Sequence, residues 1–292
     1  MSVSDYFSSF CSNLRMNDDT VEKIQNRYKQ ITKRINIDYW GSTSETLHSL
    51  YVGSYGRGTE IWTSDIDIIV QLPTATYNKF NSYNSNGQSA LLQEVKNVLQ
   101  KTYDTTHIKG DGQVIALNFN DNINFEIVPG FINNINSYNY PDTNNGGSWK
   151  TTDPRKEIEA INSRNTLTNK NLKRLCRMAR AWKNNCDVPM SGILIDTLAY
   201  KFLGDWSHKE KSYLYYDFMS RDFFKYLKDI DTSQHYWLAP GSNRYVFKTG
   251  NFQTKAATAY TDSLQAVEYE NKDLHYSSKQ AWRKIYGTKF PS

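Results

Sequence analysis

The spacing of hydrophobic residues predicts a chain that combines strands in its first half with helices throughout. Apolar side chains that recur every three or four positions are typical of amphipathic helices. Alternating or continuous apolar residues between turn signals indicate strands instead. The helical spacing covers residues 19–36, a segment starting at Ser89, and 169–186, 192–203, 213–230 and 253–272. Strands are expected near 65–70 and over 113–119 and 123–128.

Polar and breaker residues divide these elements. We expect a short helix over 44–50 and a loop rich in Asn and Ser over 73–88. Asp153 followed by Pro154 is typical of a helix start, with Asp at the N-cap and Pro at the first helical position. The prediction is therefore an α+β fold in two parts: a mixed sheet with helices over residues 1–150 and a helical domain over 151–292.

The strand expected at 65–70 carries Asp65 and Asp67, which point to the same face because side chains two residues apart do so in a strand. Two neighbouring carboxylates repel each other unless a cation lies between them, and Mg²⁺ is a cation that often bridges carboxylates and phosphates. Gly53, Ser54 and the glycines that follow can form a turn whose backbone approaches a phosphate closely. Asp-x-Asp alone also fits a surface strand with two solvated acids.

Glu126 lies within the otherwise apolar strand expected at 123–128. A buried carboxylate is costly unless it has a partner, so Glu126 requires an ion pair, solvent or a metal. An edge-strand residue that faces water is the simpler alternative. Asp121 is a rival acid, although Asp is common in turns for local reasons.

A basic face on the helix expected over 169–186 carries Lys173, Arg177, Arg180 and Lys183. This face could be solvated or could neutralise a polyanion. Ser191 precedes the next helix, where a plain N-cap would explain it without any function.

The composition limits the partners. The 292 residues carry a net charge of +5, which permits a polyanionic ligand but does not require long nucleic acid. Apolar runs fall short of the roughly 18 to 20 residues that span a bilayer, and a signal peptide is not evident. We expect the three cysteines to be reduced thiols. The spacing of the cysteines and histidines is not that of zinc ligands. We therefore expect a cytoplasmic protein without a membrane partner.

The combination of Gly53-Ser54, ten intervening residues and Asp65-Ile66-Asp67 resembles the signature of the polymerase-β-type nucleotidyltransferases. More narrowly, the chain resembles the bacterial CD-NTases, relatives of cyclic GMP-AMP synthase and the oligoadenylate synthetases. The resemblance extends to Phe125-Glu-Ile-Val-Pro129, to the connecting segment that ends at Asp153-Pro154, to Leu175-Cys-Arg-Met-Ala-Arg-Ala-Trp182 and to the tail 281–291. It implies a catalytic core packed on a helical half, with the active site between them and the N-terminal helix bridging both. It also implies that no fused sensor domain follows.

The resemblance further implies roles for single residues. Asp65, Asp67 and Glu126 would hold two Mg²⁺ ions, for which Mn²⁺ can substitute. Gly53, Ser54, Arg180 and Ser191 would bind the donor triphosphate, although the family has Lys where this chain has Arg180.

The activity implied is condensation of NTPs, with ATP among them, into a cyclic di- or trinucleotide, with release of pyrophosphate and a role in anti-phage signalling. A regulatory or effector protein could respond to the product. The alternatives are a nucleotidyltransferase that acts on an RNA end or a small-molecule hydroxyl, and a non-catalytic nucleotide-binding module. The residues themselves argue only for nucleotidyl transfer.

Overall fold

The computed structural model describes residues 2–61 and 65–292, so residues 62–64 of the predicted linker before Asp65 lie outside the described part. The chain forms two compact units. The first, which we call the sheet unit, comprises Met16–Gly56 and Thr63–Arg155. The second, the helical unit, comprises Met1–Arg15, Arg57–Trp62 and Lys156–Ser292.

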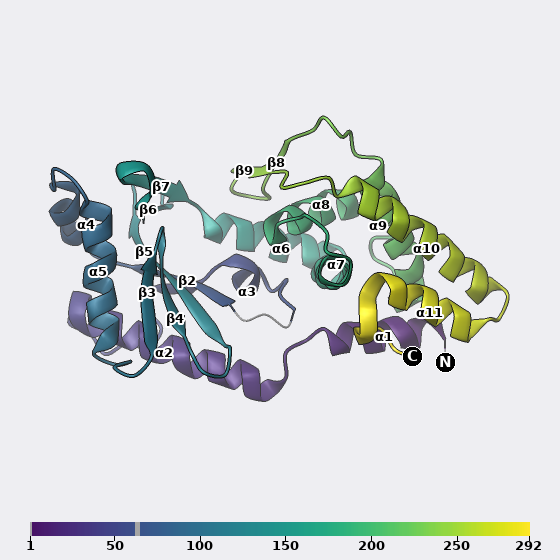
Figure 1. Cartoon of the computed structure of the whole chain (residues 1–292), viewed down its shortest axis with the longest axis horizontal. Helices are drawn as coiled ribbons and strands as arrows, with labels where there is room; N and C mark the ends of the chain where they lie inside the picture. The colour runs from purple at the N-terminus through teal and green to yellow at the C-terminus, as the bar shows by residue number, and fades with distance from the viewer. Residues whose placement is uncertain (1, 62–64) are drawn as a thin grey trace. The chain divides into compact units, whose positions relative to one another are not determined.

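The sheet unit is built on a seven-stranded mixed sheet (Figure 1). The main strand order is β1-β2-β5-β4-β3, and β6 pairs with both β5 and β7. In the described part of the sheet, β2 and β5 run parallel and all other neighbouring strands are antiparallel. The strands are β1 (Ser49–Tyr51), β2 (Asp65–Gln71), β3 (His107–Asp111), β4 (Val114–Asn118), β5 (Asn124–Ile132), β6 (Tyr138–Asp142) and β7 (Ser148–Thr152).

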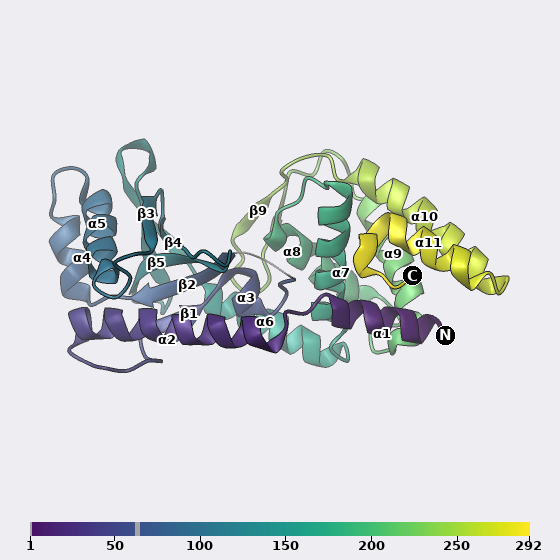
Figure 2. The same cartoon turned by 60° about the horizontal axis from the view of Figure 1, so that its bottom comes forward.

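Three helices cover the apolar face of this sheet: α2 (Asp18–Trp40), α4 (Thr74–Asn81) and α5 (Gly87–Gln100). Ile24, Ile31 and Ile35 of α2 belong to one core with Ile66 and Ile68 of β2, and all five are fully buried. Figure 2 shows α2 running along the sheet. Since alternate residues of a strand point in opposite directions, the odd-numbered residues Asp65 and Asp67 lie on the face away from these helices.

The helical unit has a core of its own. Its main helices are α1 (Val3–Asn13), α6 (Pro154–Leu167), α7 (Asn171–Cys186), α8 (Gly192–Asp205), α9 (Tyr216–Lys228), α10 (Gln253–Asn271) and α11 (His275–Tyr286), with a small hairpin of β8 (Tyr236–Leu238) and β9 (Tyr245–Phe247). Figure 1 shows α10 between α9 and α11, the two helices with which it makes most of its contacts. None of the described helices is long and apolar enough to cross a membrane.

The N-terminal segment belongs to the helical unit because its aromatic side chains complete that core. Phe7 packs edge-on against Trp282, with ring centroids 5.2 Å apart, and Phe10 lies 4.6 Å from Tyr286. The main division between the units falls between Arg155 and Lys156, within ten residues of the boundary expected near residue 150, and two earlier segments depart from that division. Residues 1–15 and 57–62 group with the C-terminal helices, and α2 groups with the sheet.

Two local predictions were wrong. Residues 44–48 form turns instead of a helix, and Ser49–Tyr51 is a strand paired with β2. The cause is the buried Asn36, whose side-chain amide donates to the carbonyls of Ser44 and Leu47 and holds this segment in a non-helical path. Residues 74–81, expected to be loop, form α4 because Phe80 buries its ring in the core of the sheet unit.

Candidate active site

The adjacent parallel strands β2 and β5 bring three carboxylates together on one face of the sheet unit. Their register places Asp67 opposite Glu126 and Asp65 opposite Asn124. The intervening Ile66 and Phe125 are fully buried on the other face, so the strand alternation directs all three acids away from the core. The structure therefore places Asp65, Asp67 and Glu126 on one face of the sheet, as the sequence predicts.

Glu126 is not an edge-strand residue, because β5 lies between β2 and β4 in the sheet. Burial raises the pKa of the half-buried Glu126 carboxyl, and the charges of Asp67 and Asp65 and a hydrogen bond with Asp67 raise it further. Among the described residues no three His, Cys, Asp or Glu side chains are arranged so that they could hold a metal ion. The chemistry of three carboxylates on one face nevertheless fits a divalent cation, which would relieve their repulsion.

The glycine turn approaches the acids directly. Gly53 begins the short helix α3 (Gly53–Arg57) with φ +59°, a conformation that favours glycine. A Cβ at this position would overlap the carboxylate of Asp67 and lie 2.6 Å from its Cγ. The backbone N–H of the preceding Val52 donates to the Asp67 carbonyl at 2.9 Å. Gly53 is thus required by the Asp67 side chain itself, and Ser54 follows it in the same turn.

Asp121, the rival acid, has a structural partner. Its carboxylate accepts two hydrogen bonds from the Arg27 guanidinium at 2.9 and 2.8 Å, and this pairing lowers the Asp121 pKa. Arg27 also packs over the ring of Phe119. Asp121 therefore ties α2 to the turn between β4 and β5.

Arg180 differs from its predicted role as a triphosphate ligand. The side chain is buried, and Nη1 and Nη2 donate to the Asp196 carboxylate at 2.6 and 3.0 Å. Both nitrogens also donate to backbone carbonyls, those of Cys176 and Gly192. These acceptors occupy the forked end of the guanidinium, so in this structure Arg180 is a buried structural cation.

The Asp196 carboxylate also binds Arg57, the residue at which the glycine turn ends. Arg57 Nε and Thr59 Oγ1 each donate to Asp196 Oδ2 at 2.9 Å. Arg57 Nη1 also reaches Glu157 at 3.2 Å. Sequence reasoning missed this network. The available signal was Asp196 itself, a charged residue that follows the apolar run Ile193–Ile195 and had to find a cation once buried.

Ser191 is the N-cap of α8, as its position predicts, and its Oγ accepts a hydrogen bond from the Leu194 N–H at 3.3 Å. The hydroxyl proton can still donate to a ligand. Its role toward a triphosphate stays a prediction.

The chain is similar to known proteins in both sequence and fold. Residues 1–165 match the family described as Second Messenger Oligonucleotide or Dinucleotide Synthetase domain. A probable cyclic nucleotide synthase of Bacillus cereus (strain VD146) is 27% identical over 180 residues, which are 58% of this chain and 52% of that protein. The alignment thus spans about half of this curated relative.

Solved structures of several bacterial proteins share the fold. The structure of CdnC from E. coli MS115-1 with ATP matches with a TM-score of 0.68 at 14% identity and covers 99% of both chains. CdnC in complex with HORMA-deltaN gives a TM-score of 0.72 at 13% identity over 99% of this chain and 98% of that one. The Vibrio cholerae cyclic AMP-GMP synthase DncV with a linear intermediate gives 0.65 at 12% identity, covering 99% and 87%.

These neighbours confirm the predicted α+β fold, with its mixed sheet and helical C-terminal region. The family match covers more than half of the chain, including the glycine turn and both acidic strands. The chain belongs to the family of second messenger oligonucleotide or dinucleotide synthetases.

Proposed function

We propose that the protein is a metal-dependent nucleotidyltransferase that condenses NTPs into a cyclic di- or trinucleotide and releases pyrophosphate. The observation that carries this proposal is the register of β2 and β5, which sets Asp67 beside Glu126 with Asp65 on the same face. Family membership and the Bacillus cereus relative, named as a probable cyclic nucleotide synthase, support the choice of reaction.

Asp65, Asp67 and Glu126 would hold divalent cations, two Mg²⁺ ions in the proposal, with Mn²⁺ as a substitute. When bound, such ions supply a lowered pKa for an attacking hydroxyl and charge stabilisation at the transferring phosphoryl group. The protein's part is to hold the three carboxylates on a rigid pair of central strands. The apolar residues on the opposite face of these strands prevent them from shifting register.

Gly53, Ser54 and Ser191 would position the donor triphosphate. Gly53 lets the backbone of the turn lie against Asp67, so that Ser54 is presented next to the acids. Ser191 offers a hydroxyl at the start of α8, where the helix N-terminus favours negative charge. Arg180 has no place in this part of the proposal because its guanidinium is occupied by Asp196.

The direct test is incubation with labelled NTPs and Mg²⁺ in the absence of any other acceptor. We expect a small product that resists phosphatase, because a cyclic oligonucleotide has no terminal phosphate, and mass spectrometry should give its composition. A phosphatase-sensitive or absent product would contradict cyclisation. Turnover that appears only when RNA or another hydroxyl acceptor is added would instead favour a transferase with a different acceptor.

A signalling role in anti-phage defence is part of the proposal and follows from the class of product. The CdnC structure that includes HORMA-deltaN supports a regulatory protein partner as a component of such a system. For this chain we expect such a partner to change the rate of product formation without changing the product.

Glu126→Gln should change the dependence of metal binding on pH. Because the pKa of Glu126 is raised, the metal-free protein keeps this carboxyl protonated to a higher pH than the unfolded chain does. The contribution of Glu126 to stability is therefore present at low pH and is lost as the pH rises through its raised pKa. Metal binding must displace the proton, so Mn²⁺ affinity in the wild type should fall as the pH decreases towards that pKa.

The measurement is calorimetric titration of Mn²⁺ into both proteins between pH 5 and 8. We expect Glu126→Gln to bind about 10- to 100-fold more weakly at pH 8, with little further loss at pH 5. Its metal-free melting temperature at pH 8 should equal or exceed that of the wild type. Equal pH dependence in the two proteins would remove Glu126 from the metal site.

Gly53→Ala should lower the rate of product formation while leaving the fold intact. The added Cβ would collide with the Asp67 carboxylate, and the backbone at φ +59° is strained for alanine. We expect a loss of about 100-fold, since displacement by about 1 Å can cost that much. Gly41→Ala is a matched control, because Gly41 has φ +61° but nothing within 4 Å of its Cβ position. A similar loss in both variants would assign the effect to backbone strain alone.

A further inference from the structure

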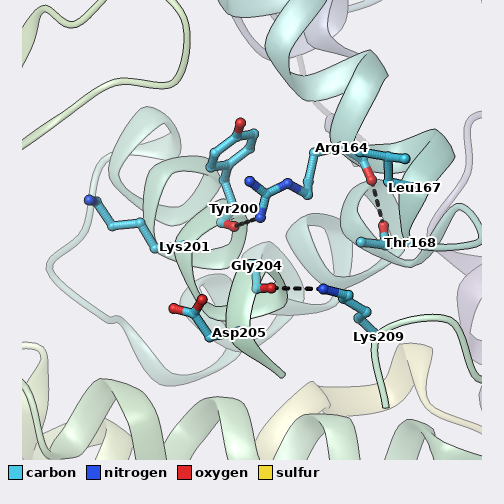
Figure 3. Close-up of a pocket in the computed structure, with 8 residues that line it drawn as sticks. All are labelled: Arg164, Leu167, Thr168, Tyr200, Lys201, Gly204, Asp205 and Lys209. Carbon is cyan, nitrogen blue, oxygen red and sulfur yellow. Dashed lines mark hydrogen bonds between the residues drawn. The ribbon is translucent and has the colours of Figure 1, made fainter. Parts of the chain in front are cut away.

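A pocket on the helical unit lies where α6 and α8 end, well separated from the N-terminal end of α8. Its volume is about 410 Å³, within the range of small-molecule sites. Three cationic side chains, Arg164, Lys201 and Lys209, line it together with one carboxylate, Asp205 (Figure 3). Ser191 begins the same 14-residue helix, so its N-cap lies about 20 Å from this end.

Arg164 is held in place without being saturated. Its Nη1 donates to the Tyr200 carbonyl at 3.3 Å, and its guanidinium carbon lies 4.2 Å from the centroid of the Tyr200 ring. Among the described residues, its Nε and Nη2 have no acceptor. A half-buried guanidinium with two unused donor groups is prepared for an anionic ligand, because Arg presents its donors as a rigid fork.

Gly204 provides the room for this arrangement. A Cβ at Gly204 would overlap Arg164 Nη1 and lie 3.5 Å from its Cζ, so any larger residue would displace the guanidinium. Glycine lowers helix stability relative to alanine, yet it occupies the last turn of α8. Glycine at position 204 therefore leaves room for the Arg164 guanidinium and lowers the stability of the helix.

Stabilisation of the helix ends explains only some of the charged side chains in this pocket. Lys209 Nζ donates to the Gly204 carbonyl at 3.0 Å, and cations near a helix C-terminus are favourable. These contacts with the backbone carbonyls of α8 use one N–H group of Lys209 and one of Arg164. They leave the remaining donors, the exposed Lys201 and the hollow itself unexplained.

We propose that this pocket binds a small phosphate ester. The four charged residues give a formal charge of +2, which matches the roughly −1.5 to −2 of a phosphate monoester at pH 7 better than a single carboxylate. The donors of Arg164 and Lys209 would hold the phosphate, and Lys201 adds charge at the rim. The rest of the volume, next to Tyr200 and Leu167, accommodates the organic part of the ligand.

The test uses calorimetric titration of AMP, inorganic phosphate and citrate into the full chain with EDTA present, so it does not depend on turnover. We expect AMP to bind more tightly than phosphate or citrate. Gly204→Ala, which changes no charge, should weaken AMP binding about tenfold, and Lys209→Gln at least as much. Lys255→Gln on α10 removes an exposed charge outside the pocket and should stay within twofold of the wild type.

Melting temperatures exclude misfolding, because Gly204→Ala should melt no lower than the wild type. Unchanged AMP affinity in both pocket variants would overturn the proposal. If citrate bound as tightly as AMP, the site would attract anions by charge alone. If inorganic phosphate bound as tightly as AMP, the site would not recognise the organic part of an ester. Either result would contradict the proposal. None of these outcomes bears on the acids of β2 and β5, so failure here is distinct from failure of the proposed synthase.

Discussion

Asp67→Asn is expected to lower the rate of product formation by about 1,000-fold or more while the protein stays folded. Asp67 lies between the two other acids, opposite Glu126 in the parallel ladder and two residues from Asp65 on the same face. Loss of its charge removes the carboxylate best placed to share cations with both neighbours. Metal ions contribute several kcal/mol of transition-state stabilisation, and about 4 kcal/mol corresponds to a factor of about 1,000.

The readout is the initial rate with labelled NTPs and saturating Mg²⁺, together with the circular dichroism spectrum of both proteins. Asp121→Asn is the matched control, because this acid lies near the start of β5 but is paired with Arg27. It should retain at least half of the wild-type rate. If Asp67→Asn retained more than a tenth of the wild-type rate, the acids of β2 and β5 would not be the catalytic metal site.

The elements that carry these acids were predictable from local patterns. The Asp-Ile-Asp-Ile-Ile-Val run shows by its period of two that the acids and the isoleucines occupy opposite faces, and Ile66 and Ile68 are fully buried. The long helices α2, α7 and α10 lie where the apolar spacing predicts them, because each buries residues that recur every three or four positions, although α7 is also buried all round over residues 178–182. In these segments local propensity and tertiary packing favour the same structure.

The wrong predictions arise where a contact distant in sequence decides the local conformation. Residues 44–48 take their path from Asn36 and from pairing of the next three residues with β2. The grouping of 1–15 with the C-terminal helices depends on rings from opposite ends of the chain, such as Phe7 and Phe290 with centroids 5.2 Å apart. Periodicity reports only neighbours along the chain, so it cannot reveal these choices.

The candidate site shows the same division. Alternation placed Asp65 and Asp67 on one face, and the apolar strand around Glu126 made this acid a candidate. Its assignment to the metal site rested on the family resemblance. The occupation of Arg180 by Asp196 could not be found in that way, because the basic face of a helix does not show which of its cations is buried. The register of β2 and β5 also needed the structure, since it joins residues about 60 positions apart.

Asp196→Asn should be the most destabilising of these substitutions. The Asp196 carboxylate is fully buried and accepts from Arg57, Arg180 and Thr59. The two guanidiniums lower its pKa far enough to outweigh the effect of burial, which acts in the opposite direction. Removal of the charge leaves two buried arginines, of which only Arg57 has another acid, Glu157. Breaking a buried ion pair in this way costs about 3 to 5 kcal/mol.

Urea unfolding followed by tryptophan fluorescence would measure this loss, and Trp182, Trp206, Trp237 and Trp282 report on the helical unit. Asp205→Asn is the matched control on the same helix; it is exposed and should change the free energy of unfolding by less than about 0.5 kcal/mol. Because the Asp196 pKa is lowered, its contribution is present above the unfolded value near 3.9 and is lost as the pH falls below it. The stability difference between wild type and Asp196→Asn should therefore shrink in acid.

Arg180→Met then separates the structural role of Arg180 from a ligand role. If Arg180 serves Asp196, as the hydrogen bonds indicate, the substitution lowers the free energy of unfolding and leaves KM for the NTP close to the wild-type value. If Arg180 binds the triphosphate instead, KM rises at least tenfold while stability is nearly unchanged. The two roles predict opposite results in two independent measurements. A rise in KM without loss of stability would therefore restore Arg180 to the nucleotide site and contradict the geometry described here.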